Sequence, residues 1–434
     1  MSTPKTVRIG LAGFGNVGAG VYKHVNANRE LLAIRTGANL EIKKIAVRDL
    51  DKPRTVEVPK ELMTTDIKEL TEDPEIDIVV ELMGGTGRAN ELVEAALKAQ
   101  KPVVTGNKHL LAEKGIDLIS LAEKENVPLY CEAAVAGGIP IIKAVSEALV
   151  GNHILSIHGI INGTCNYILT RMTDAGLAFE DALKEAQDLG FAEADPTLDI
   201  NGWDAAHKAI ILAWLSYGRW IHPDEISVEG IQAISSEDIG FADSLGYAIK
   251  LVGVVRPGDD GAVEVRVGPS LLPKSHILSS VNGVFNAVAV RGDVVGETLF
   301  YGSGAGQDAT SSAVIGDLAD AAANIGHGTS FEGFIPHGDY GTAIPLDDTV
   351  SQYYLRLQVA DKPGTVAQIA KALAAREIGI NSFIQPEAGE EGDHAQIVLM
   401  THDAPYGKMR EALSEISGLD VVTGEPTWLR VEAP

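Results

Sequence analysis

The chain has 434 residues, more than one hydrophobic core usually holds, so about two to four domains are expected. Apolar residues make up 45%, aromatic residues 5%, and 46 residues are glycine, a balance that favours an α/β enzyme over an all-β sandwich. The formal net charge of −25 argues against binding to nucleic acid or to an anionic membrane surface, because like charges repel.

Cysteine content and the N-terminal residues bear on the compartment. The two cysteines, Cys131 and Cys165, form no CxxC pair, which argues against a disulfide framework and a structural zinc site. Residues 1–6 are polar and run into a strand without a signal peptide, and no apolar run is long enough to span a bilayer. A cytoplasmic protein that does not contact membranes is therefore expected.

Residues 1–135 predict a domain in which strands and helices alternate. The expected strands are Val7–Ala12, Leu40–Val47, Ile76–Glu81, Lys101–Thr105 and Pro128–Ala134. The expected helices run from residue 16 to about residue 32, and over Ala89–Ala99 and Gly115–Glu125. Alternating elements predict a parallel sheet wound on both faces, so the domain is expected to be a Rossmann-like, NAD(P)-binding α/β domain.

Residues 136–325 change in character and predict an α+β domain. The expected helices are Ile139–Val150, Cys165–Asp174, Phe179–Leu189 and Gly202–Ser216. The expected strands are Ile154–Ile161, Ala262–Val267, Gly283–Arg291 and Glu297–Gly302. A second glycine loop at residues 302–306 precedes a helix at Thr310–Asn324, and residues 303–325 could return to the first domain.

Residues 326–350 are rich in Gly, Pro, Thr and Asp and predict a linker. The expected elements beyond it are, in order, Tyr353–Ala360 (strand), Thr365–Arg376 (helix), Ile380–Gln385 (strand), Ala395–Thr401 (strand), Tyr406–Ile416 (helix) and Thr427–Val431 (strand). This β-α-β-β-α-β order predicts a ferredoxin-like domain over residues 351–434.

Gly13, Gly15 and Gly18 form a Gly-x-Gly-x-x-Gly motif between the first strand and the first helix. The glycines permit a tight turn and let backbone amides approach a pyrophosphate, and the helix N-terminus adds partial positive charge. In this context the motif predicts a dinucleotide site. The alternative is a glycine turn that only packs the helix on the strand.

The end of the second strand bears on the choice between NAD and NADP. An acidic residue there favours NAD, and a basic residue accommodates the 2′-phosphate of NADP. Arg48 and Asp49 offer both, and Arg48 together with Lys52 or Arg54 could hold a 2′-phosphate. We favour NADP over the alternative of a solvated charge cluster.

Lys108 follows the strand that ends at Thr105, which places it at the carboxyl edge of the predicted sheet, where ligands collect. Its ammonium group could hydrogen-bond a reacting oxygen or stabilise negative charge. A lysine after a strand is, as an isolated feature, usually only solvated.

The stretch Gly190–Lys208 places four acidic residues and one lysine around a loop and a helix start. Asp204 and Lys208 are four residues apart, so they share one face of a helix. The lysine could donate a proton as a hydride reaches a carbonyl carbon, and the other carboxylates could bind a substrate ammonium group. The alternative is an ordinary helix salt bridge, which spacing alone favours.

Three long runs resemble blocks of the homoserine dehydrogenase family: Gly190–Ala209, Glu132–Pro140 and Gly159–Leu169. Together with the N-terminal glycine motif, the resemblance extends in order from the N-terminus to about residue 320. Several long motifs in the correct succession are more specific than any one of them alone.

The resemblance implies an enzyme of threonine, methionine and isoleucine biosynthesis that reduces L-aspartate 4-semialdehyde to L-homoserine with NAD(P)H. Lys208 would donate the proton to the aldehyde oxygen, and Asp204 would position substrate and lysine. Glu193 and Asp199 would bind homoserine, Glu193 at its amino group, and Lys108 would assist at the reacting oxygen. Residues 136–325 would form the substrate-binding, catalytic and dimerisation domain.

The resemblance also implies two ligand sites. The nucleotide would be bound by Gly13, Phe14, Gly15, Asn16, Val17, Gly18, Arg48, Thr105, Lys108 and Gly306. A monovalent cation, usually sodium in this family, would be held by the backbone carbonyls of Val135, Gly137 and Ile139 together with Glu132. The residues themselves carry no sign of this cation site without the family.

Two positions depart from the family pattern. Cys165 stands where the family usually has threonine, which could change packing near the substrate or make the enzyme thiol-sensitive. Ala309 stands where proline is typical, which bears on the rigidity of the second glycine loop.

The last domain resembles an ACT domain, with Asp361, Lys362, Pro363 and Gly364 between its first strand and helix. Such domains commonly pair between chains and bind amino acids. The resemblance therefore suggests an effector such as threonine and a homodimer or homotetramer. The alternative is a domain used only for oligomerisation, because fold does not imply function.

Two other functions are weighed against this one. A dehydrogenase of the glyceraldehyde-phosphate type needs a nucleophilic cysteine beside a histidine, and neither Cys131 nor Cys165 has such a setting. A catalytically inactive amino-acid sensor with the same fold would tolerate the loss of Lys208 or Asp204. Both residues are present.

Overall fold

The computed structural model describes residues 5–258, 261–327, 339–385 and 394–432. The chain folds into two compact units, each built from three segments. The first comprises Met1–Ile161, Asp204–Asp224 and Phe285–Gly341, and the second comprises Asn162–Trp203, Glu225–Val284 and Thr342–Pro434. These units share the expected middle domain, residues 136–325, between them. Of the expected linker at residues 326–350, residues 328–338 lie outside the described residues.

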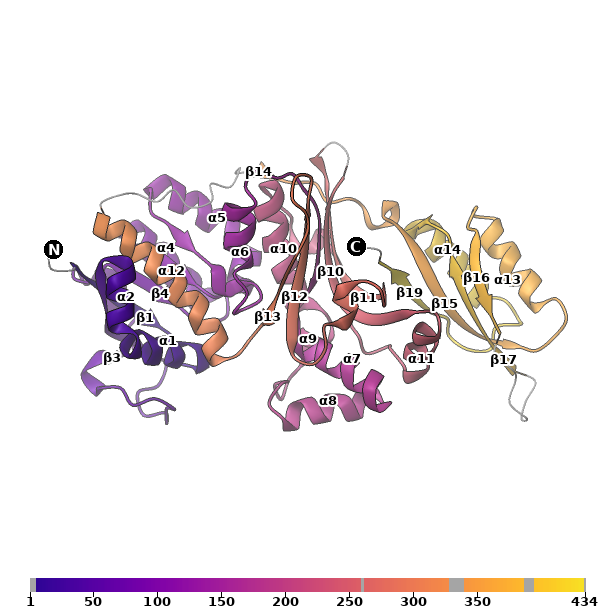
Figure 1. The fold of residues 1–434 in the computed structure, drawn as a ribbon, viewed down its shortest axis with the longest axis horizontal. Helices are drawn as coiled ribbons and strands as arrows, with labels where there is room; N and C mark the ends of the chain where they lie inside the picture. The colour runs from indigo at the N-terminus through magenta and orange to yellow at the C-terminus, as the bar shows by residue number, and fades with distance from the viewer. Residues whose placement is uncertain (1–4, 259–260, 328–338, 386–393, 433–434) are drawn as a thin grey trace. The chain divides into compact units, whose positions relative to one another are not determined.

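The first unit contains a six-stranded parallel sheet in the order β3-β2-β1-β4-β5-β6 (Figure 1). Its strands are β1 (Lys5–Ala12), β2 (Ala38–Ala46), β3 (Met63–Thr64), β4 (Ile78–Glu81), β5 (Val103–Thr105) and β6 (Leu129–Tyr130). This is the strand order of the Rossmann fold. The predicted parallel α/β domain is therefore confirmed.

Helices cover both faces of this sheet. One layer consists of α1 (Asn16–Ala27), α2 (Arg29–Thr36) and α12 (Gln307–His327), and the other of α3 (Lys68–Glu72), α4 (Gly87–Lys98) and α5 (Lys108–Glu125). Val7, Ile9 and Leu11 of β1 are fully buried against the first layer. Burial on both faces explains why the strands are almost continuously apolar.

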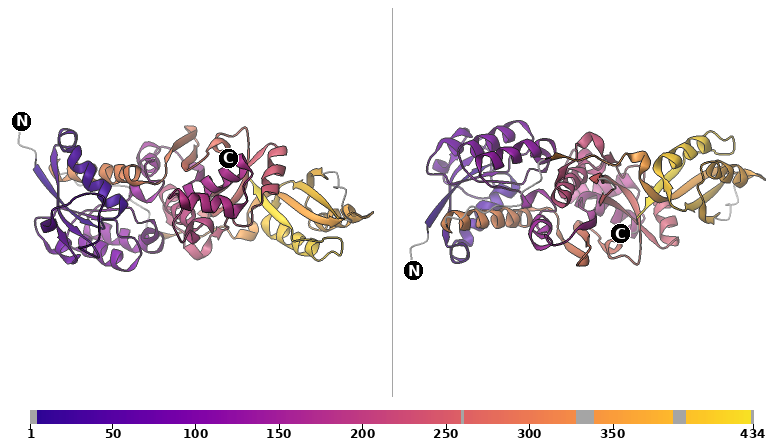
Figure 2. Two further views of the ribbon diagram at one scale, coloured as in Figure 1. Left: turned by 90° about the horizontal axis from the view of Figure 1, so that it is seen from below. Right: turned by 90° about the horizontal axis from the view of Figure 1, so that it is seen from above.

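Helix α12 follows β1 by almost 300 positions in the sequence, yet it packs against α1. Val314 and Leu318 are buried in the same core as β1. Gly20 permits the close approach, because a Cβ there would lie 2.8 Å from the Cγ of Gln307. Both views in Figure 2 show α12, in orange, beside the indigo N-terminal elements.

The rest of the first unit includes an antiparallel set of strands: β7 (Ile154–Ile160), β12 (Phe285–Gly292) and β13 (Gly296–Ser303). It also includes the strongly apolar helix α10 (Trp203–Tyr217) from residue 204 onward, and the short parallel pair of β8 (Arg219–Trp220) with β14 (Asp339–Tyr340). Helix α10 is buried along most of its length. It can therefore hold a polar side chain away from solvent.

Two expected elements between residues 128 and 150 differ from the structure. The expected strand Pro128–Ala134 ends at Tyr130, because Glu132–Ala134 form a 3₁₀-helix. The expected helix Ile139–Val150 begins at Ile141 as α6 (Ile141–Lys143) and continues as a π-helix over Ala144–Ala148. The positive φ angles of Ala136 (53°) and Gly137 (48°) turn the chain before Pro140, whose missing N–H suits a helix start.

The second unit contains helices α7 (Gly163–Ala175), α8 (Phe179–Asp188), α9 (Thr197–Ile200) and α11 (Ser236–Ser244). Its long antiparallel strands are β10 (Tyr247–Pro257) and β11 (Val263–Pro273), and the short strand β9 (Ser227–Val228) pairs with β11. The sequence analysis did not predict α11 or β10. Helix α11 begins at a capping box in which Ser235 and Asp238 satisfy each other's backbone amides.

The C-terminal part of the second unit has the predicted β-α-β-β-α-β order. It consists of β15 (Val350–Ala360), α13 (Thr365–Ala374), β16 (Ile380–Ile384), β17 (His394–Thr401), α14 (Tyr406–Ser417) and β19 (Thr427–Val431), with the two-residue strand β18 (Ala404–Pro405) paired to β15. The sheet order is β19-β15-β17-β16. Buried residues of both helices and the sheet form one core, which is the ferredoxin-like arrangement.

Strand β19 belongs to two sets of strands at once. It pairs antiparallel with β15 and parallel with β11, where Ser270 lies opposite Arg430. Directly after it, Glu432 accepts a hydrogen bond from Arg256 at 2.7 Å and another from Arg266. The C-terminal subdomain is thus joined to β11 by backbone pairing, and to β10 and β11 by the ion pairs of Glu432 with Arg256 and Arg266.

No helix within the described ranges has both the length and the apolar character needed to cross a membrane.

Candidate active site

A pocket of about 630 Å³ opens at the carboxyl ends of β1, β2 and β4 in the first unit. Its walls are the loops that follow these strands: Gly13–Asn16, Ala46–Asp49 and Leu82–Gly85, with further residues between 52 and 88. The strand order reverses direction between β1 and β4, and open α/β sheets bind ligands at such a point.

The three motif glycines have separate roles at this pocket. Gly13 has φ +97°, and a Cβ there would lie 2.3 Å from the carbonyl oxygen of Leu82. A Cβ on Gly18 would lie 2.2 Å from the carbonyl oxygen of Gly13, which would block the packing of α1 on β1. A Cβ on Gly15 would meet nothing within 4 Å. The space at Gly15 and the helix that starts at Asn16 suit a bound pyrophosphate.

The other residues expected at the nucleotide lie around this motif. Phe14 lines the pocket, but its ring is buried and contacts Tyr22 edge-on at 5.9 Å between centroids. Val17 is half-buried in the first turn of α1. Gly306 precedes α12, and the next residue, Gln307, donates a hydrogen bond to the carbonyl oxygen of Asn16 at 3.0 Å. The second glycine loop therefore adjoins the first.

Four cationic side chains line the pocket, from Arg48, Lys52, Arg54 and Arg88. Among the described residues that line this pocket, Asp49 alone carries a carboxylate, so this wall is positively charged. The Arg54 guanidinium donates to the carbonyl oxygen of Asp49 at 2.5 Å and lies 5.6 Å from the centroid of the Phe14 ring. Arg88 was missed from the sequence, although its place in the first turn of the helix after β4 could have indicated it.

Thr105 lies beneath the sheet edge rather than in the pocket wall. It is fully buried, and its hydroxyl donates to Glu81 Oε2 at 2.7 Å. Glu81 also accepts from the amide of Met83 at 2.7 Å, and Asn107 donates to the carbonyl oxygen of Gly85 at 2.8 Å. These bonds connect the pocket loop after β4 to the start of α5.

Glu81 was missed in the sequence analysis. Its carboxylate is fully buried at the end of β4, and burial raises its pKa against the opposing effect of the Thr105 hydroxyl and the backbone amides. An acidic residue that closes an apolar strand, as in the run Ile78–Glu81, was the available signal.

Three predicted catalytic side chains meet in the first unit. Lys208 Nζ lies 2.7 Å from Asp204 Oδ2, and Lys108 Nζ lies 3.1 Å from Asp204 Oδ1. Lys208 also donates to the carbonyl oxygen of Ile161 at 2.6 Å. Asp204 and Lys208 are buried, whereas the Lys108 side chain is 38% exposed. One carboxylate thus binds two ammonium groups, and the cluster is reached from solvent on the Lys108 side.

Local structure explains this convergence. Asp204 and Lys208 lie one turn apart on α10, as their spacing predicted. Lys108 is the first residue of α5, which is capped by Asn107 through a hydrogen bond from the amide of Leu110 at 3.1 Å. The cap fixes where α5 begins, and therefore where the Lys108 side chain leaves the backbone.

The predicted substrate residues Glu193 and Asp199 lie in the second unit. Asp199 Oδ1 accepts a hydrogen bond from Asn162 at 2.7 Å, and its carbonyl oxygen accepts one from the Cys165 thiol at 3.1 Å. Glu193 is exposed, and its carbonyl oxygen accepts a bond from Gln187 at 3.2 Å. The structure therefore groups the two lysines with Asp204, and it places the two predicted substrate carboxylates in the other unit.

The predicted cation residues occupy a buried turn of the first unit. The carboxylate of Glu132 accepts hydrogen bonds from the amides of Ile142 and Lys143, each at 2.9 Å. The amide of Glu132 in turn donates to Asp317 on α12 at 2.9 Å. Burial raises the pKa of Glu132 against the effect of these backbone amides.

Two backbone carbonyl oxygens of this turn could still accept a hydrogen bond or bind a cation. Among the described residues, no hydrogen bond reaches the carbonyl oxygen of Val135 or of Gly137, and both residues are buried. The carbonyl oxygen of Ile139 accepts from Ile141 at 2.8 Å. Within the described ranges, no group of three or more histidine, cysteine, aspartate or glutamate side chains could hold a metal ion. A cation here would depend on carbonyl oxygens, which suit a hard ion.

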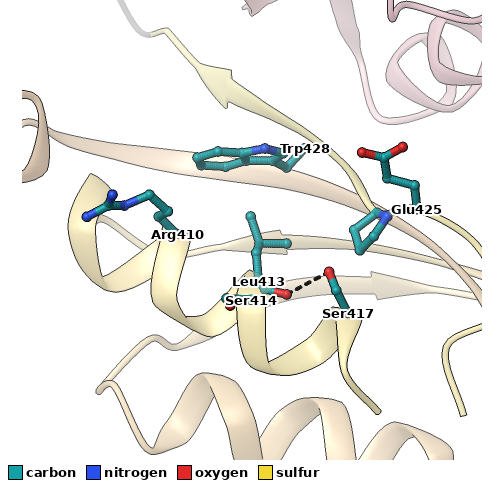
Figure 3. A pocket seen from close by; sticks show the side chains of 7 residues that line it. Arg410, Leu413, Ser414, Ser417, Glu425 and Trp428 are labelled. Atoms are coloured by element: carbon teal, nitrogen blue, oxygen red, sulfur yellow. Dashed lines mark hydrogen bonds between the residues drawn. The ribbon is translucent and has the colours of Figure 1, made fainter. Parts of the chain in front are cut away.

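A second pocket, of about 230 Å³, lies in the C-terminal subdomain (Figure 3). It is lined by Arg410, Leu413, Ser414, Ser417, Glu425, Pro426 and Trp428. Figure 3 shows Arg410 and Glu425 at opposite ends, with the Trp428 ring above Leu413. Opposite charges at the two ends of a pocket suit a small zwitterion.

Comparisons with known proteins bear on both units. A sequence model of the family described as homoserine dehydrogenase matches residues 140–319, and one described as homoserine dehydrogenase, NAD binding domain, matches residues 13–132. A homoserine dehydrogenase of Neisseria gonorrhoeae is 44% identical over 99% of this chain and 99% of its own.

Two solved structures extend the likeness. A homoserine dehydrogenase from Thiobacillus denitrificans has a TM-score of 0.92 and 41% identity, covering 99% of this chain and 98% of its own. A hyperthermophilic archaeal homoserine dehydrogenase in complex with NADPH has a TM-score of 0.60 and 30% identity, covering 73% of this chain and 97% of its own. With full-length similarity at this level, and with the glycine motif and lysine pair in place, the chain belongs to the homoserine dehydrogenase family.

Proposed function

We propose that this protein is an NAD(P)-dependent homoserine dehydrogenase, an oxidoreductase that interconverts L-aspartate 4-semialdehyde and L-homoserine. The observation that carries the proposal is the meeting of Lys108 and Lys208 on Asp204 in the unit that holds the glycine-motif pocket. Family membership over the full chain supports it. The reaction transfers a hydride and a proton, so it needs no nucleophilic side chain that forms a covalent intermediate.

In the proposed reaction, Lys208 donates a proton to the aldehyde oxygen during reduction and takes it back during oxidation. Asp204 keeps the ammonium group oriented, because its Oδ2 holds Lys208 at 2.7 Å. Lys108, on the solvent side of the cluster, stabilises negative charge on the same oxygen. The nicotinamide cofactor, when bound, supplies or accepts the hydride.

We propose NADP as the preferred cofactor. Arg48, Lys52, Arg54 and Arg88 give the pocket beyond β2 a positive wall, and a 2′-phosphate adds two negative charges that such a wall can bind. The Gly15 surface, which has room above it, would receive the pyrophosphate. Lys108 and Gly306 would border the nicotinamide end, and Thr105, which is buried, would support it through its hydrogen bond to Glu81.

Glu193 and Asp199 are proposed to bind the amino-acid part of the substrate, with Glu193 at its ammonium group. An exposed carboxylate such as Glu193 is free to approach a cation. Asp199 is oriented by Asn162, which also caps α7, so its carboxylate direction is fixed.

A monovalent cation, sodium by family resemblance, is proposed at Glu132, Val135, Gly137 and Ile139. The buried carbonyls of Val135 and Gly137, which accept no hydrogen bond from the described part of the chain, fit this group. The turn also contacts the second glycine loop, because Gly138 donates to the carbonyl oxygen of Ser303 at 3.0 Å. A bound cation would therefore support the loop beside the nucleotide rather than react.

The C-terminal subdomain, residues 351–434, is proposed to be an ACT domain that binds an amino-acid effector such as threonine and joins chains into a homodimer or homotetramer. Its β-α-β-β-α-β order supports this, and the pocket between Arg410 and Glu425 offers both charges that a zwitterion needs. With this assignment we propose four segments: a nucleotide-binding domain to residue 135, a substrate domain to residue 325, a linker to residue 350, and the ACT domain after it.

The deciding experiment is a spectrophotometric assay at 340 nm with L-homoserine, with NADP and NAD offered separately, for the wild type and for Lys208→Ala. Turnover that collapses in the variant supports the dehydrogenase and the proton-transfer role, and the better cofactor is read directly. Absence of turnover in well-folded wild-type protein contradicts the proposal and favours an amino-acid sensor.

A further inference from the structure

Two histidines lie directly beside the two lysines of the candidate active site. Lys108 precedes His109 at the start of α5, and His207 precedes Lys208 on α10. The imidazole rings of His109 and His207 are stacked, with centroids 4.9 Å apart and planes at 8°. Two adjacent side-chain contacts therefore join the same two helices, one ionic and one between rings.

The stack and the ion pairs constrain each other. Asp204 holds Lys108 at 3.1 Å and Lys208 at 2.7 Å, so both ammonium groups depend on the separation of α5 and α10 at this point. Parallel rings with centroids 4.9 Å apart set that separation. If the helices came closer, the two rings would collide, and if they moved apart, the stacking contact would be lost. The ring contact is therefore a spacer for the lysine pair.

The charge state of the pair fits this role. Burial, and then His109, lowers the pKa of His207 to about 4, so its ring is neutral near pH 7. The charged groups that face it are Asp204 on its own helix and Lys108 and Glu113 on α5. His109 is held from the other side by Glu113, at 2.7 Å from its Nε2. A neutral His207 adds no third positive charge beside the lysines.

We infer that the His109–His207 stack is a positioning element, which sets the distance between Lys108 and Lys208 on Asp204 and thereby the rate of proton transfer. This inference rests on the proposed dehydrogenase function. It assigns no direct contact between either histidine and the substrate. The rings act through the helices that carry the lysines.

The test compares His207→Ala with His207→Phe in the full-length protein, by steady-state oxidation of L-homoserine with NADP. Removal of the ring should lower kcat roughly 10- to 100-fold, because a shift of about 1 Å at a reacting group has that effect. Phenylalanine restores a flat ring, so His207→Phe should recover most of kcat. The dissociation constant for NADPH, measured by fluorescence, should change far less than kcat in both, because the glycine-motif pocket is lined by other residues.

Further variants keep the inference testable if His207→Ala does not fold. His109→Ala breaks the same stack from its partly exposed side, and the double variant should cost no more than either single one. His222→Ala, at an exposed position of the first unit, is the matched histidine control. Additive losses, an unchanged kcat in His109→Ala, or a His207→Phe variant no faster than His207→Ala would overturn the inference while the wild type stays active. No turnover by the wild type would instead overturn the proposed function, and the inference with it.

Discussion

Asp204 and Glu432 are carboxylates that each bind two cationic side chains, and their surroundings differ. Asp204 binds Lys108 and Lys208, and the cluster is open to solvent at Lys108. Glu432 binds Arg256 and Arg266 and is itself 1% exposed. A lysine ammonium can release its proton, whereas arginine keeps its charge and holds a carboxylate in a fixed planar fork. One carboxylate with two cations thus suits proton transfer at Asp204, and it suits the joining of strands at Glu432.

The largest effect should come from removing the lysine that can transfer a proton. Lys208→Ala should lower kcat by about 10³-fold, within the range for loss of a general acid–base group. Lys208→Arg should be almost as slow, because arginine does not release its proton near neutral pH. Steady-state kinetics with L-homoserine measure both. Lys98→Ala, at an exposed lysine of the same unit, is the control, and a fast Lys208→Arg enzyme would contradict the proton-transfer role.

A substitution in the cluster of Glu432, Arg256 and Arg266 should change the stability of the protein rather than its catalytic rate. Glu432→Gln removes the charge that pairs with the buried Arg266 and the half-buried Arg256, and it should lower the free energy of unfolding by about 3 kcal/mol, as for other broken buried ion pairs. Chemical denaturation measures the change. Glu94→Gln, which removes an exposed pair with Lys98, should cost less than about 1 kcal/mol. Equal losses in the two variants would show that burial of the Glu432 cluster does not matter.

The cationic side chains of the nucleotide pocket differ from both clusters, because they do not converge on one carboxylate. Arg48→Ala should raise the KM for NADP by about 10-fold or more, since a hydrogen bond to a charged group contributes about 1.5–3 kcal/mol. The KM for NAD should change little, because NAD lacks the 2′-phosphate. Arg35→Ala, at an exposed position on α2, serves as the control. An equal rise for both cofactors would place Arg48 at the shared part of the nucleotide.

The smallest effect concerns Glu81, a buried carboxylate that accepts hydrogen bonds from Thr105, Asn107 and the amide of Met83. Burial raises its pKa above the ordinary 4.5, so the folded protein favours the protonated form. Wild-type stability is therefore full below the unfolded pKa and falls as pH rises through the folded value. Glu81→Gln removes the titrating carboxyl group and with it this pH dependence of stability. The melting temperature of the variant relative to wild type should therefore increase as pH rises above 4.5. A pH-independent difference would contradict the raised pKa.

Local patterns explain what could be predicted. The Rossmann-like domain follows from alternating strands and helices, and Asp204 and Lys208 share a helix face because four residues make about one turn. Strand β10 was missed because it is buried on both faces and shows no alternation of polar and apolar residues. Its mostly apolar run, interrupted at Lys250, cannot be told from a buried helix by periodicity.

Contacts between distant residues explain what could not be predicted. The ion pair of Lys108 with Asp204 and the ring stack of His109 with His207 join positions almost 100 residues apart, and no spacing rule reaches that far. The proposed cation site at Glu132, Val135, Gly137 and Ile139 gave no signal in the sequence, because backbone carbonyls are common to all residues.

The position of β19 between β11 and β15 has a consequence for synthesis. Residues 427–431 follow every other described strand, so they leave the ribosome after β10, β11 and β15 have already emerged. Until then, one edge of β11 and one edge of β15 expose unpaired backbone groups, which are prone to pair with other chains. The nascent second unit must therefore wait for β19, and slow translation of the codons for this strand should increase its aggregation.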